Sequence, residues 1–400
     1  MKKYLFSELL ADSRSGFWGL EPGESEIDVR VVRNGDIQVD GVHWHTLPIR
    51  SVSISEAERS ILRKGDILIT TSGECGYSAH IESEPEERTI ASNFVRILRF
   101  DNTKVIPRFA FHFVHSKDFL RKLAPHIRGT TLKNLSFATA IKHIEFGLPS
   151  LAKQLRIADI LDKVGTLTVK RMEALKQLDC LRKSIFMDMF GDPASNPKGW
   201  TVVQLGEVIE DLTDYHANGS YEILRNHVAL LDTPDFALML RTTDLESNNY
   251  IDGVKYISES AYNFLKKSKV FGGEIIINKI GSAGKVYLAP NFNRPVSLGM
   301  NSFLLRISKV ANAQYIYHVL TTKYIEGIIH SKVRGAVTKT ITKEAVRSIK
   351  IPLPPLDIQL EFARRINAVE TLKASHRNSL VTMEGLFDSL KCRAFRGELV

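Results

Sequence analysis

Cysteine is scarce in this chain of 400 residues, which has three, at Cys75, Cys180 and Cys392. They are odd in number and widely scattered, and no two form a Cys-x-x-Cys pair. The sequence therefore offers neither a disulfide framework nor a zinc knuckle. This cysteine usage fits a reducing compartment, and we expect the protein to be cytoplasmic.

Long hydrophobic runs are also missing. No stretch of about 18 consecutive apolar residues occurs, which excludes a membrane-spanning helix of ordinary length. The N-terminal segment MKKYLFSELLADSR has two lysines, but Glu8 and Asp12 interrupt an apolar run that is already short. We therefore expect no signal peptide.

Recognisable catalytic and cofactor-binding motifs are absent too. Gly281-Ser-Ala-Gly-Lys285 lacks the spacing of a phosphate-binding loop, and Val286 stands where a magnesium-binding hydroxyl belongs. His43 and His45 have no third ligand at metal-like spacing. No Asn/Asp-Pro-Pro-Tyr/Phe motif of adenine methylation occurs, and a faint nuclease-like carboxylate set has Asn248 in place of its lysine. We expect no metal, no cofactor and no catalytic residue.

What the chain does have is a moderate excess of positive charge. Lysine and arginine number 54 against 45 acidic residues, which gives a net charge of +9. That excess is compatible with a polyanionic partner, although many basic proteins bind none. The length suits two domains with connecting elements, and the apolar content of 44% is that of a globular protein.

An internal repeat organises the chain. Residues 148–200 begin with LPSLAKQL and end with FGDPASNPKGW, and a second copy begins with LPPLDIQL at Leu353. The copies align without a gap at an offset of 205, which superimposes Pro149 on Pro354, Gln154 on Gln359 and Phe190 on Phe395. Each copy is predicted to form a long helix, so the sequence indicates a duplicated protein built on two helices.

The repeat predicts four segments: globular domains over residues 1–147 and 198–351, and helical segments over 148–197 and 352–400. Each globular domain is expected to mix strands and helices. In the first, we expect strands near 29–37, 93–99 and 141–146, a turn followed by an apolar strand over 62–70, and a helix near 109–123. Residues 221–226 are expected to repeat the first strand, so that Arg225-Asn226 would match Arg33-Asn34. The fold class is thus α+β with a pseudo-two-fold duplication.

Both helical segments carry an apolar stripe at heptad spacing, which predicts an antiparallel pair of coiled-coil helices. At about 1.5 Å per residue, forty residues span roughly 60 Å. A polar residue at a seam position commonly fixes register, and we expect Arg171 and His376 to lie near each other, within roughly two helical turns along the axis. The alternative is that the seam faces outward there. The predicted seam comprises Ile157, Val164, Arg171, Leu178 and Ile185 in the first helix, and Phe362, Val369, His376, Met383 and Leu390 in the second.

Three segments together resemble the specificity (S) subunits of type I restriction-modification systems: residues 189–200, Ile351-Pro-Leu-Pro-Pro-Leu-Asp-Ile-Gln359 and Ala394-Phe-Arg-Gly-Glu-Leu399. Their order and duplication are more specific than any one motif, and the first copy lacks the full Pro-x-Pro-Pro. The resemblance implies a non-catalytic subunit whose two target-recognition domains each read one half of a bipartite site in double-stranded DNA. It also implies that the helices set the gap and dock two methylation subunits, which restriction subunits join.

Two basic, glycine-containing loops have physical grounds for contacting DNA phosphates, because a cation there stands beside flexible backbone. Base reading needs Arg, Asn, Gln or Lys on loops that reach a groove. Arg-Asn pairs at strand ends are alternatively plain turn formers. The phosphate candidates are Arg128, Gly129, Lys133, Arg334, Gly335 and Lys339; the base-reading candidates are Arg33, Asn34, Arg225, Asn226, Lys279 and Ser282.

The two globular domains share a scaffold but differ strongly between matched segments, as two reading heads for different targets would; neutral drift after duplication is the alternative. A coiled-coil adaptor without DNA reading of its own is the other functional class that fits the helices. A self-contained endonuclease is disfavoured by the missing carboxylate–lysine site.

Overall fold

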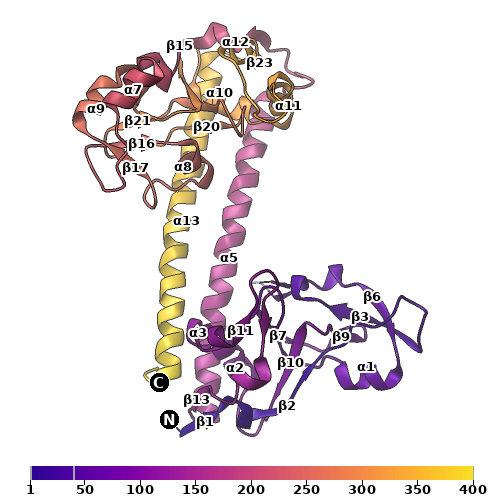
Figure 1. Ribbon diagram of the computed structural model, residues 1–400. Coiled ribbons are helices and arrows are strands. Elements are labelled where there is room, and N and C mark those ends of the chain that lie inside the picture. The colour runs from indigo at the N-terminus through magenta and orange to yellow at the C-terminus, as the bar shows by residue number, and fades with distance from the viewer. Residues whose placement is uncertain (1, 39–40, 400) are drawn as a thin grey trace. The chain divides into compact units, whose positions relative to one another are not determined.

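The computed structural model describes residues 2–38 and 41–399. The chain divides into two compact units, one formed by the chain up to Leu175 together with the chain from Ser375 onward, the other by Lys176–Ala374. Each unit holds a β-rich domain and part of both long helices, α5 (Leu151–Phe190) and α13 (Leu356–Arg396) (Figure 1). The expected α+β class is confirmed.

The first unit contains two sheets. A four-stranded antiparallel sheet has the order β2 (Leu10–Ser15), β10 (Val95–Phe100), β7 (Ile67–Thr70) and β8 (Ser78–His80). A three-stranded sheet has the order β6 (Ile49–Val52), β3 (Ile27–Val32) and β9 (Thr89–Ala91), in which β3 and β9 are parallel. All four residues of β7 are buried, so both of its faces are covered, which explains why its first three residues are apolar.

Short pairings and helices complete this unit. The predicted helix over 109–123 is two helices, α2 and α3, because the Ser116 hydroxyl accepts the Phe119 N–H and starts a new helix. The strand expected over 141–146 begins later than predicted, as β13. The elements are β1 (Lys2–Leu5) paired with β13 (Glu145–Leu148), β4 (Ile37–Gln38) with β5 (Gly41–Val42), β11 (Ile127–Arg128) with β12 (Asn134–Leu135), and α1 (Ile54–Ser60), α2 (Pro107–Val114), α3 (Lys117–Leu123) and α4 (Phe137–Ala140).

The second unit repeats this topology. One sheet has the order β15 (Ile209–Asp214), β22 (Ser302–Ile307), β19 (Ile275–Asn278) and β20 (Val286–Leu288). The other has the order β17 (Lys255–Ile257), β16 (Ala237–Leu240), β21 (Val296–Leu298) and β18 (Lys269–Val270), with β16 and β21 parallel. Its other elements include β14 (Thr201–Gln204) paired with β23 (Lys350–Leu353), and α6 (Leu205–Val208), α7 (Tyr221–His227), α8 (Thr242–Ser247), α9 (Glu259–Phe264), α10 (Ala313–Leu320), α11 (Lys323–Lys332) and α12 (Lys343–Arg347).

The strand expected over residues 221–226 is wrong, because this segment is helix α7. The Ser220 hydroxyl accepts the Ile223 N–H, an N-cap that the strand interpretation overlooked. The counterpart of β3 is instead β16, since each pairs with one antiparallel and one parallel neighbour. At the resulting offset of 208, Arg33 corresponds to Arg241 and not to Arg225.

A buried glutamine anchors the start of each long helix. The Gln154 side chain accepts the Ile106 N–H and donates to the Lys104 and Pro149 carbonyls. Gln359 likewise accepts the Asn312 N–H and donates to the Pro354 carbonyl. Both side chains are almost fully buried, so each amide ties its helix to the loop that precedes α2 or α10. This explains why the glutamine recurs in both copies of the repeat.

The FGDPASNPKGW segment is an elaborate C-terminal cap for α5. Gly191 lies at φ +77°, where an added Cβ would come within 2.5 Å of the Pro197 ring. The Lys198 ammonium donates to the Asp188 and Met189 carbonyls, and the Trp200 indole donates to the Phe190 carbonyl. The last turn of the helix therefore finds side-chain donors for carbonyls that have no helical partner.

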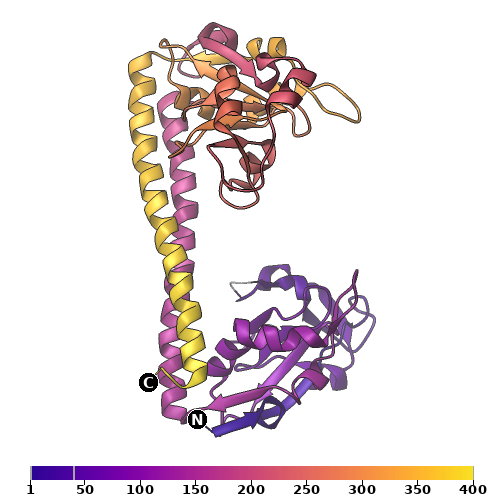
Figure 2. The ribbon, with the colours of Figure 1, turned by 60° about the vertical axis from the view of Figure 1, so that its left-hand side comes forward.

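Within each unit, α5 and α13 lie side by side and antiparallel (Figures 1 and 2). In the first unit the Phe387 ring lies 3.9 Å from where a Cβ on Gly165 would stand, and Ile157 shares a core with Ala394. In the second unit the Phe186 and Phe362 rings meet with centroids 5.8 Å apart.

The predicted seam residues of α13 lie on its inner side, with Phe362 and Val369 buried and the other three half-buried. In α5, contacts with α13 are made by Gly165, Asp179, Arg182 and Phe186, each within a few residues of the predicted positions. Ile157 is buried, and Val164, Arg171, Leu178 and Ile185 are half-buried. The seam assignment as a whole stays a prediction.

A buried lysine supplies a polar contact between the helices. The Lys373 ammonium lies 2.7 Å from an Asp179 oxygen and 3.4 Å from a Glu370 oxygen, and its side chain is 4% exposed. The Gly165–Phe387 register places Arg171 five residues, or roughly 7.5 Å, from the level of His376. The proximity of Arg171 and His376 stays a prediction, while Lys373 occupies the kind of position from which a polar residue fixes register.

Histidines occupy the contacts between the β-rich domains and the long helices. The His112 ring bonds to Asp162 of α5 at 2.7 Å, and the Arg108 guanidinium bonds to the same carboxylate at 2.8 Å. Burial lowers the pKa of His80 and of His115 to about 4. In the second unit, burial lowers the pKa of His318 to about 3, where its ring meets Phe362. These three histidines are neutral in the folded protein at neutral pH.

Stability is expected to fall as the pH drops from about 6.5 to 4.5. The folded pKa of each of these histidines lies below its ordinary value of 6.5, so the unfolded chain binds more protons in this window. Each histidine should cost at most about 2 kcal/mol of unfolding free energy at pH 5. Urea midpoints at pH 7.5 and 5.0, followed separately for each unit by hydrogen exchange, measure the loss. A variant with His318→Gln should lose part of the pH dependence in the second unit only; equal midpoints in the wild type at both pH values would contradict the prediction.

Candidate nucleic-acid interface

Each unit carries one short hairpin built from its predicted phosphate loop. In the first unit, Arg128 pairs with Asn134 as β11 joins β12. In the second, Arg334 and Thr340 exchange backbone hydrogen bonds of 2.8 Å in both directions. The two hairpins occupy equivalent positions, at an offset of 206. The structure therefore places the two phosphate loops in one recurring local structure.

Glycine is required at the same point of both hairpins. Gly129 and Gly335 have φ of +98° and +105°, in the region that favours glycine. An added Cβ would lie 2.2 Å from the Leu132 carbonyl oxygen in the first hairpin and 2.1 Å from the Thr338 oxygen in the second. The Arg-Gly pairs therefore have a structural reason of their own, independent of any ligand.

Each hairpin is bonded to a glycine-bracketed turn that follows a buried strand, β7 or β19. The Gly73 N–H donates to the Lys133 carbonyl at 2.8 Å, and the Gly281 N–H donates to the Lys339 carbonyl at 3.2 Å. We call each combination a hairpin platform: residues 71–76 with 127–135 in the first unit, and 279–284 with 333–341 in the second. A hairpin held at its base by a buried strand is a rigid place from which to present side chains.

The cations of the platforms point into solvent. Arg128, Lys133, Arg334 and Lys339 are all exposed, and none makes an ion pair with another residue that the structure describes. At the tip of the second hairpin, Val337 is 99% exposed. Exposed, unneutralised cations beside a protruding apolar tip suit contact with an anionic surface that has grooves.

The base-reading candidates Arg33 and Asn34, which follow β3, make more contacts within the domain than the exposed cations of the hairpin platforms do. Arg33 makes two bonds of 2.9 Å to the Asp36 carboxylate and a third to the Thr46 carbonyl. The Asn34 amide donates to the Ser72 carbonyl at 2.7 Å, which ties this strand end to the first platform. Both residues therefore have structural roles, as the turn-former alternative proposed.

Arg241 is the equivalent of Arg33 that sequence comparison missed. It makes the same two-pronged contact with a carboxylate three residues later, at 3.1 and 2.7 Å from Asp244, and also donates to the Gly253 carbonyl. The shared signal is Arg-x-x-Asp directly after an apolar strand, which occurs at 33–36 and 241–244. Arg225 and Asn226, chosen in its place, are exposed near the end of α7.

The remaining two candidates belong to the second platform and have partners. The Lys279 ammonium lies 3.1 Å from an Asp214 oxygen and over the Phe303 ring. The Ser282 hydroxyl donates to the Glu246 carboxylate, which also accepts from the Asn278 amide. The turn thus brings Lys279 and Ser282 beside the hairpin cations, with their polar groups oriented by neighbours.

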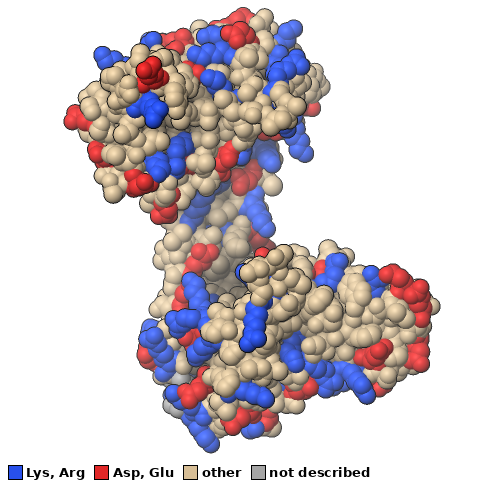
Figure 3. All heavy atoms as spheres, viewed as in Figure 1, with Lys and Arg blue, Asp and Glu red and all other residues tan. Residues whose placement is uncertain are grey.

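On the face shown in Figure 3, the positive charge is not concentrated in one surface patch. Lysine and arginine side chains are spread over both units and interleaved with acidic ones (Figure 3). Charge density alone would therefore not identify a DNA surface. The specific feature is the duplicated platform.

Comparison with known proteins decides the family. A family model described as the type I restriction modification DNA specificity domain matches residues 34–178 and again residues 197–382. The chain belongs to this family. It is a DNA specificity subunit of the type I restriction-modification kind, the non-catalytic component of such enzymes, with the specificity domain present twice. The duplication inferred from the repeat, and the family inferred from the three motifs, are confirmed.

Curated relatives share modest identity over most of the chain. The chain is 26% identical to a putative type I restriction enzyme MjaX specificity subunit of Methanocaldococcus jannaschii, over 77% of this chain and 72% of that protein. It is 21% identical to the type I restriction enzyme EcoBI specificity subunit of Escherichia coli, over 73% of this chain and 65% of that protein.

Solved structures share the fold. The S subunit of a type I restriction-modification system from M. genitalium superimposes with a TM-score of 0.60 at 16% identity, covering 98% of this chain and 96% of that one. A chain from a study of complex assembly and conformational transition in the type I R-M system gives a TM-score of 0.58 at 18% identity, covering 100% and 98%. At this level of identity the likeness extends to the fold and no further.

Two features are absent from the part of the chain that the structure describes: a membrane-spanning helix and a metal-binding cluster. Among the helices formed by residues 2–38 and 41–399, none is long and apolar enough to cross a membrane. Within the same part of the chain, no group of three or more His, Cys, Asp and Glu side chains is arranged to hold a metal ion.

Proposed function

We propose that each specificity domain of this subunit reads one half of a bipartite site in double-stranded DNA, with residues 1–147 and 198–351 as the two recognition domains. The observation that carries the proposal is the hairpin platform, which recurs in both domains with its cations exposed and unpaired among the described residues. Arg128, Lys133, Arg334 and Lys339 contact phosphates. The side chains that approach the bases include Lys279 and Ser282 of the second platform, Arg33 and Asn34 after β3, and Arg225 and Asn226 near the end of α7.

The long helices, residues 148–197 and 352–400, set the gap between the half-sites. Helix α5, of 40 residues, follows the first recognition domain and precedes the second in the chain, and forty helical residues span roughly 60 Å. The outer faces of the helices dock two methylation subunits, and restriction subunits join that assembly in the cytoplasm. Exposed apolar side chains such as Leu167, Leu181, Leu372 and Leu386 suit such docking.

Methylome sequencing tests this function directly. Cells that express the chain with its methylation partner should carry adenine methylation at one split motif, and cells that lack the chain should not. Exchange of residues 198–351 for the corresponding domain of a relative should change one half of the motif and leave the other half intact. Absence of any split motif in cells with both proteins would refute the proposal.

Replacement of Arg334 with alanine should weaken DNA binding by a similar factor for all sequences. A phosphate contact carries no base information, so the slope of log affinity against log salt should become shallower by about 1. Titration of the assembled complex with cognate and scrambled duplexes at several salt concentrations measures both quantities. Lys309→Ala, between β22 and α10, is the matched control for removing an exposed cation that has no proposed contact with DNA. A change of base preference confined to one half-site would mean that Arg334 reads bases.

A further inference from the structure

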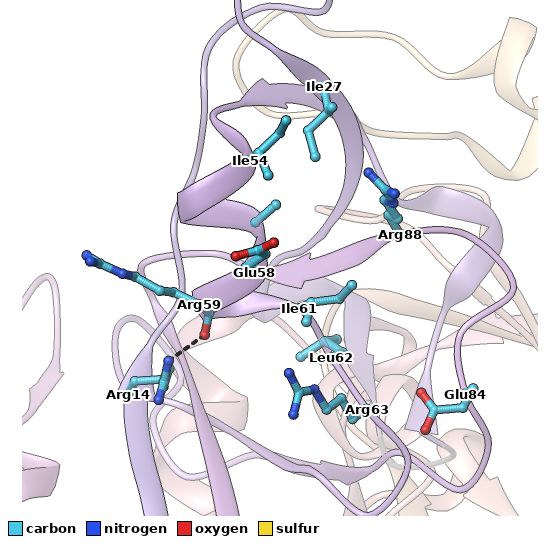
Figure 4. Close-up of a pocket in the computed structure, with 11 residues that line it drawn as sticks. Arg14, Ile27, Ile54, Glu58, Arg59, Ile61, Leu62, Arg63, Glu84 and Arg88 are labelled. Carbon is cyan, nitrogen blue, oxygen red and sulfur yellow. Dashed lines mark hydrogen bonds between the residues drawn. The ribbon is translucent and has the colours of Figure 1, made fainter.

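The first recognition domain has a groove that the hairpin platform does not use. It encloses about 940 Å³, near the upper end of the 300–1,000 Å³ typical of ligand sites. Ala57 and Leu62, both buried, form part of an apolar floor with Ile27, Ile54 and Ile61. Four arginines, Arg14, Arg59, Arg63 and Arg88, also line the groove; Figure 4 shows Ile61 and Leu62 among them, with Ile27 and Ile54 at the other end (Figure 4).

The arginines of the groove are largely available for a ligand. Arg59, Arg63 and Arg88 are exposed, and none of the three makes an ion pair within the part of the chain that the structure describes. Arg14 is held by Asp12 and by the Arg59 carbonyl, to which it donates at 2.8 Å. Two carboxylates, Glu58 and Glu84, also line the groove, so the cations outnumber the acids by four to two.

The groove lies at the opposite strand ends from the hairpin platform. Ile27 begins β3 and Arg63 precedes β7, whereas Asn34 and Ser72, which bond to each other near the platform, follow the far ends of these strands. The four residues of β7 alone separate the two ends by roughly 13 Å. The groove and the hairpin platform are therefore separate surfaces of the first recognition domain.

The second recognition domain has no equivalent set of arginines. Thr213 is the counterpart of Arg14 in the second copy of the repeat. Arg14 pairs with Ile97 and Thr213 pairs with Leu304, and Ile97 and Leu304 in turn pair with Leu68 and Ile276, which are 208 residues apart. The β3–β9 and β16–β21 pairings give Pro295 for Arg88, and the offset of 208 gives Phe271 for Arg63 and Lys267 for Arg59. Only one of the four positions therefore keeps a cation. A partner that bound both halves alike would need matched surfaces, so the occupant of this groove binds once per chain.

We propose that the groove docks an acidic peptide segment with apolar side chains, from a protein that binds the subunit on its first half only. Arginine favours carboxylates because its planar guanidinium can donate two hydrogen bonds to one carboxylate. The apolar floor discriminates against a bare phosphate backbone, which has no apolar group to bury there. This inference rests on the proposed function only in assigning DNA to the platform.

A peptide array on the full chain tests the proposal. The probes are dodecapeptides with up to six Asp or Glu and up to four Leu residues, and a scrambled 30-base-pair duplex serves as the nucleic-acid probe. Peptides rich in both acid and leucine should bind best, and the double variant Arg59→Glu/Arg63→Glu should reduce their affinity at least tenfold. Arg59→Gln/Arg63→Gln, which is gentler on folding, should reduce it about threefold or more.

Lys266→Glu/Lys267→Glu is the matched control, because these two lysines are exposed, come just after α9 in the second unit and do not line the groove. It should change peptide affinity less than twofold. The proposal is overturned if no peptide binds, if replacing leucine by serine leaves affinity unchanged, or if duplex affinity falls as much as peptide affinity in the arginine variants. If the wild-type chain does not bind the duplex, that result would count against the proposed DNA reading and not against peptide binding in the groove.

Discussion

Replacement of Phe362 with alanine is expected to destabilise the second unit by about 3–5 kcal/mol. The ring is fully buried and lies where α13 meets both α5 and α10, with centroids 5.1 Å from Phe190 and 5.1 Å from His318. Removal of the ring leaves a cavity among rigid aromatic neighbours that cannot close over it.

Hydrogen exchange measures this effect within one molecule. Amides of β19 and β22 should exchange about a hundredfold or more faster in the variant, since 1.4 kcal/mol corresponds to a factor of ten. Amides of β7 and β10, in the first unit, serve as the internal reference. Leu360→Ala, two residues earlier on the exposed side of α13, should change stability by no more than about 0.5 kcal/mol. A Phe362→Ala shift below 1 kcal/mol would show that the core does not couple the two helices to this domain.

Replacement of Gly335 with alanine is expected to deform the second hairpin platform and reduce DNA affinity by tenfold or more. The residue combines a positive φ with a Cβ position 2.1 Å from a backbone oxygen, so the hairpin backbone must move. Arg334 and Lys339 would then no longer present their charges in one geometry. The overall fold should survive, because the hairpin tip is exposed and adds little to the core.

Gly281→Ala separates the clash from the backbone strain. Gly281 has φ +83° in the same platform, but an added Cβ would meet nothing within 4 Å. It should show only the cost of the left-handed conformation, about 1–2 kcal/mol, and a smaller loss of DNA affinity. Circular dichroism verifies folding of both variants. Equal affinity of Gly335→Ala and the wild type would remove the hairpin from the proposed DNA interface.

The sequence revealed the large features because they repeat or are periodic. Two long helices follow from heptad spacing over some forty residues, and the duplication follows from motifs at one constant offset. The glutamine recurs in both copies because its amide satisfies buried backbone groups at the start of each long helix. The FGDPASNPKGW segment is distinctive because it supplies hydrogen-bond donors to the carbonyls at the end of α5. Few other residues can meet either need. The same motifs sufficed to identify the family.

The correspondence between individual residues of the two recognition domains could not be predicted where their sequences have diverged. Arg225-Asn226 shares two letters with Arg33-Asn34, yet it lies in a helix started by Ser220, while the true counterpart, Arg241, shares only the arginine and its aspartate. The residue of the second domain that corresponds to a given residue of the first is identified by its strand pairing. A residue of β16, for example, is matched to a residue of β3 because both strands have one antiparallel and one parallel neighbour. A two-letter pattern carries no information about such partners.

The sequence by itself determined the two-domain, two-helix architecture, the family and the absence of recognisable catalytic motifs, because periodicity and repetition are local properties of the chain. Only the tertiary structure decided that Arg33 is occupied by Asp36, that the Arg-Gly loops are hairpins bonded to the strand-end turns, and that Lys373 carries a buried polar contact between the helices. It alone assembled the arginine groove of the first domain, from residues that lie up to 74 positions apart. Hydrogen bonds and charges act over a few ångströms in space, and the chain distances between the groups that share them follow no periodic rule.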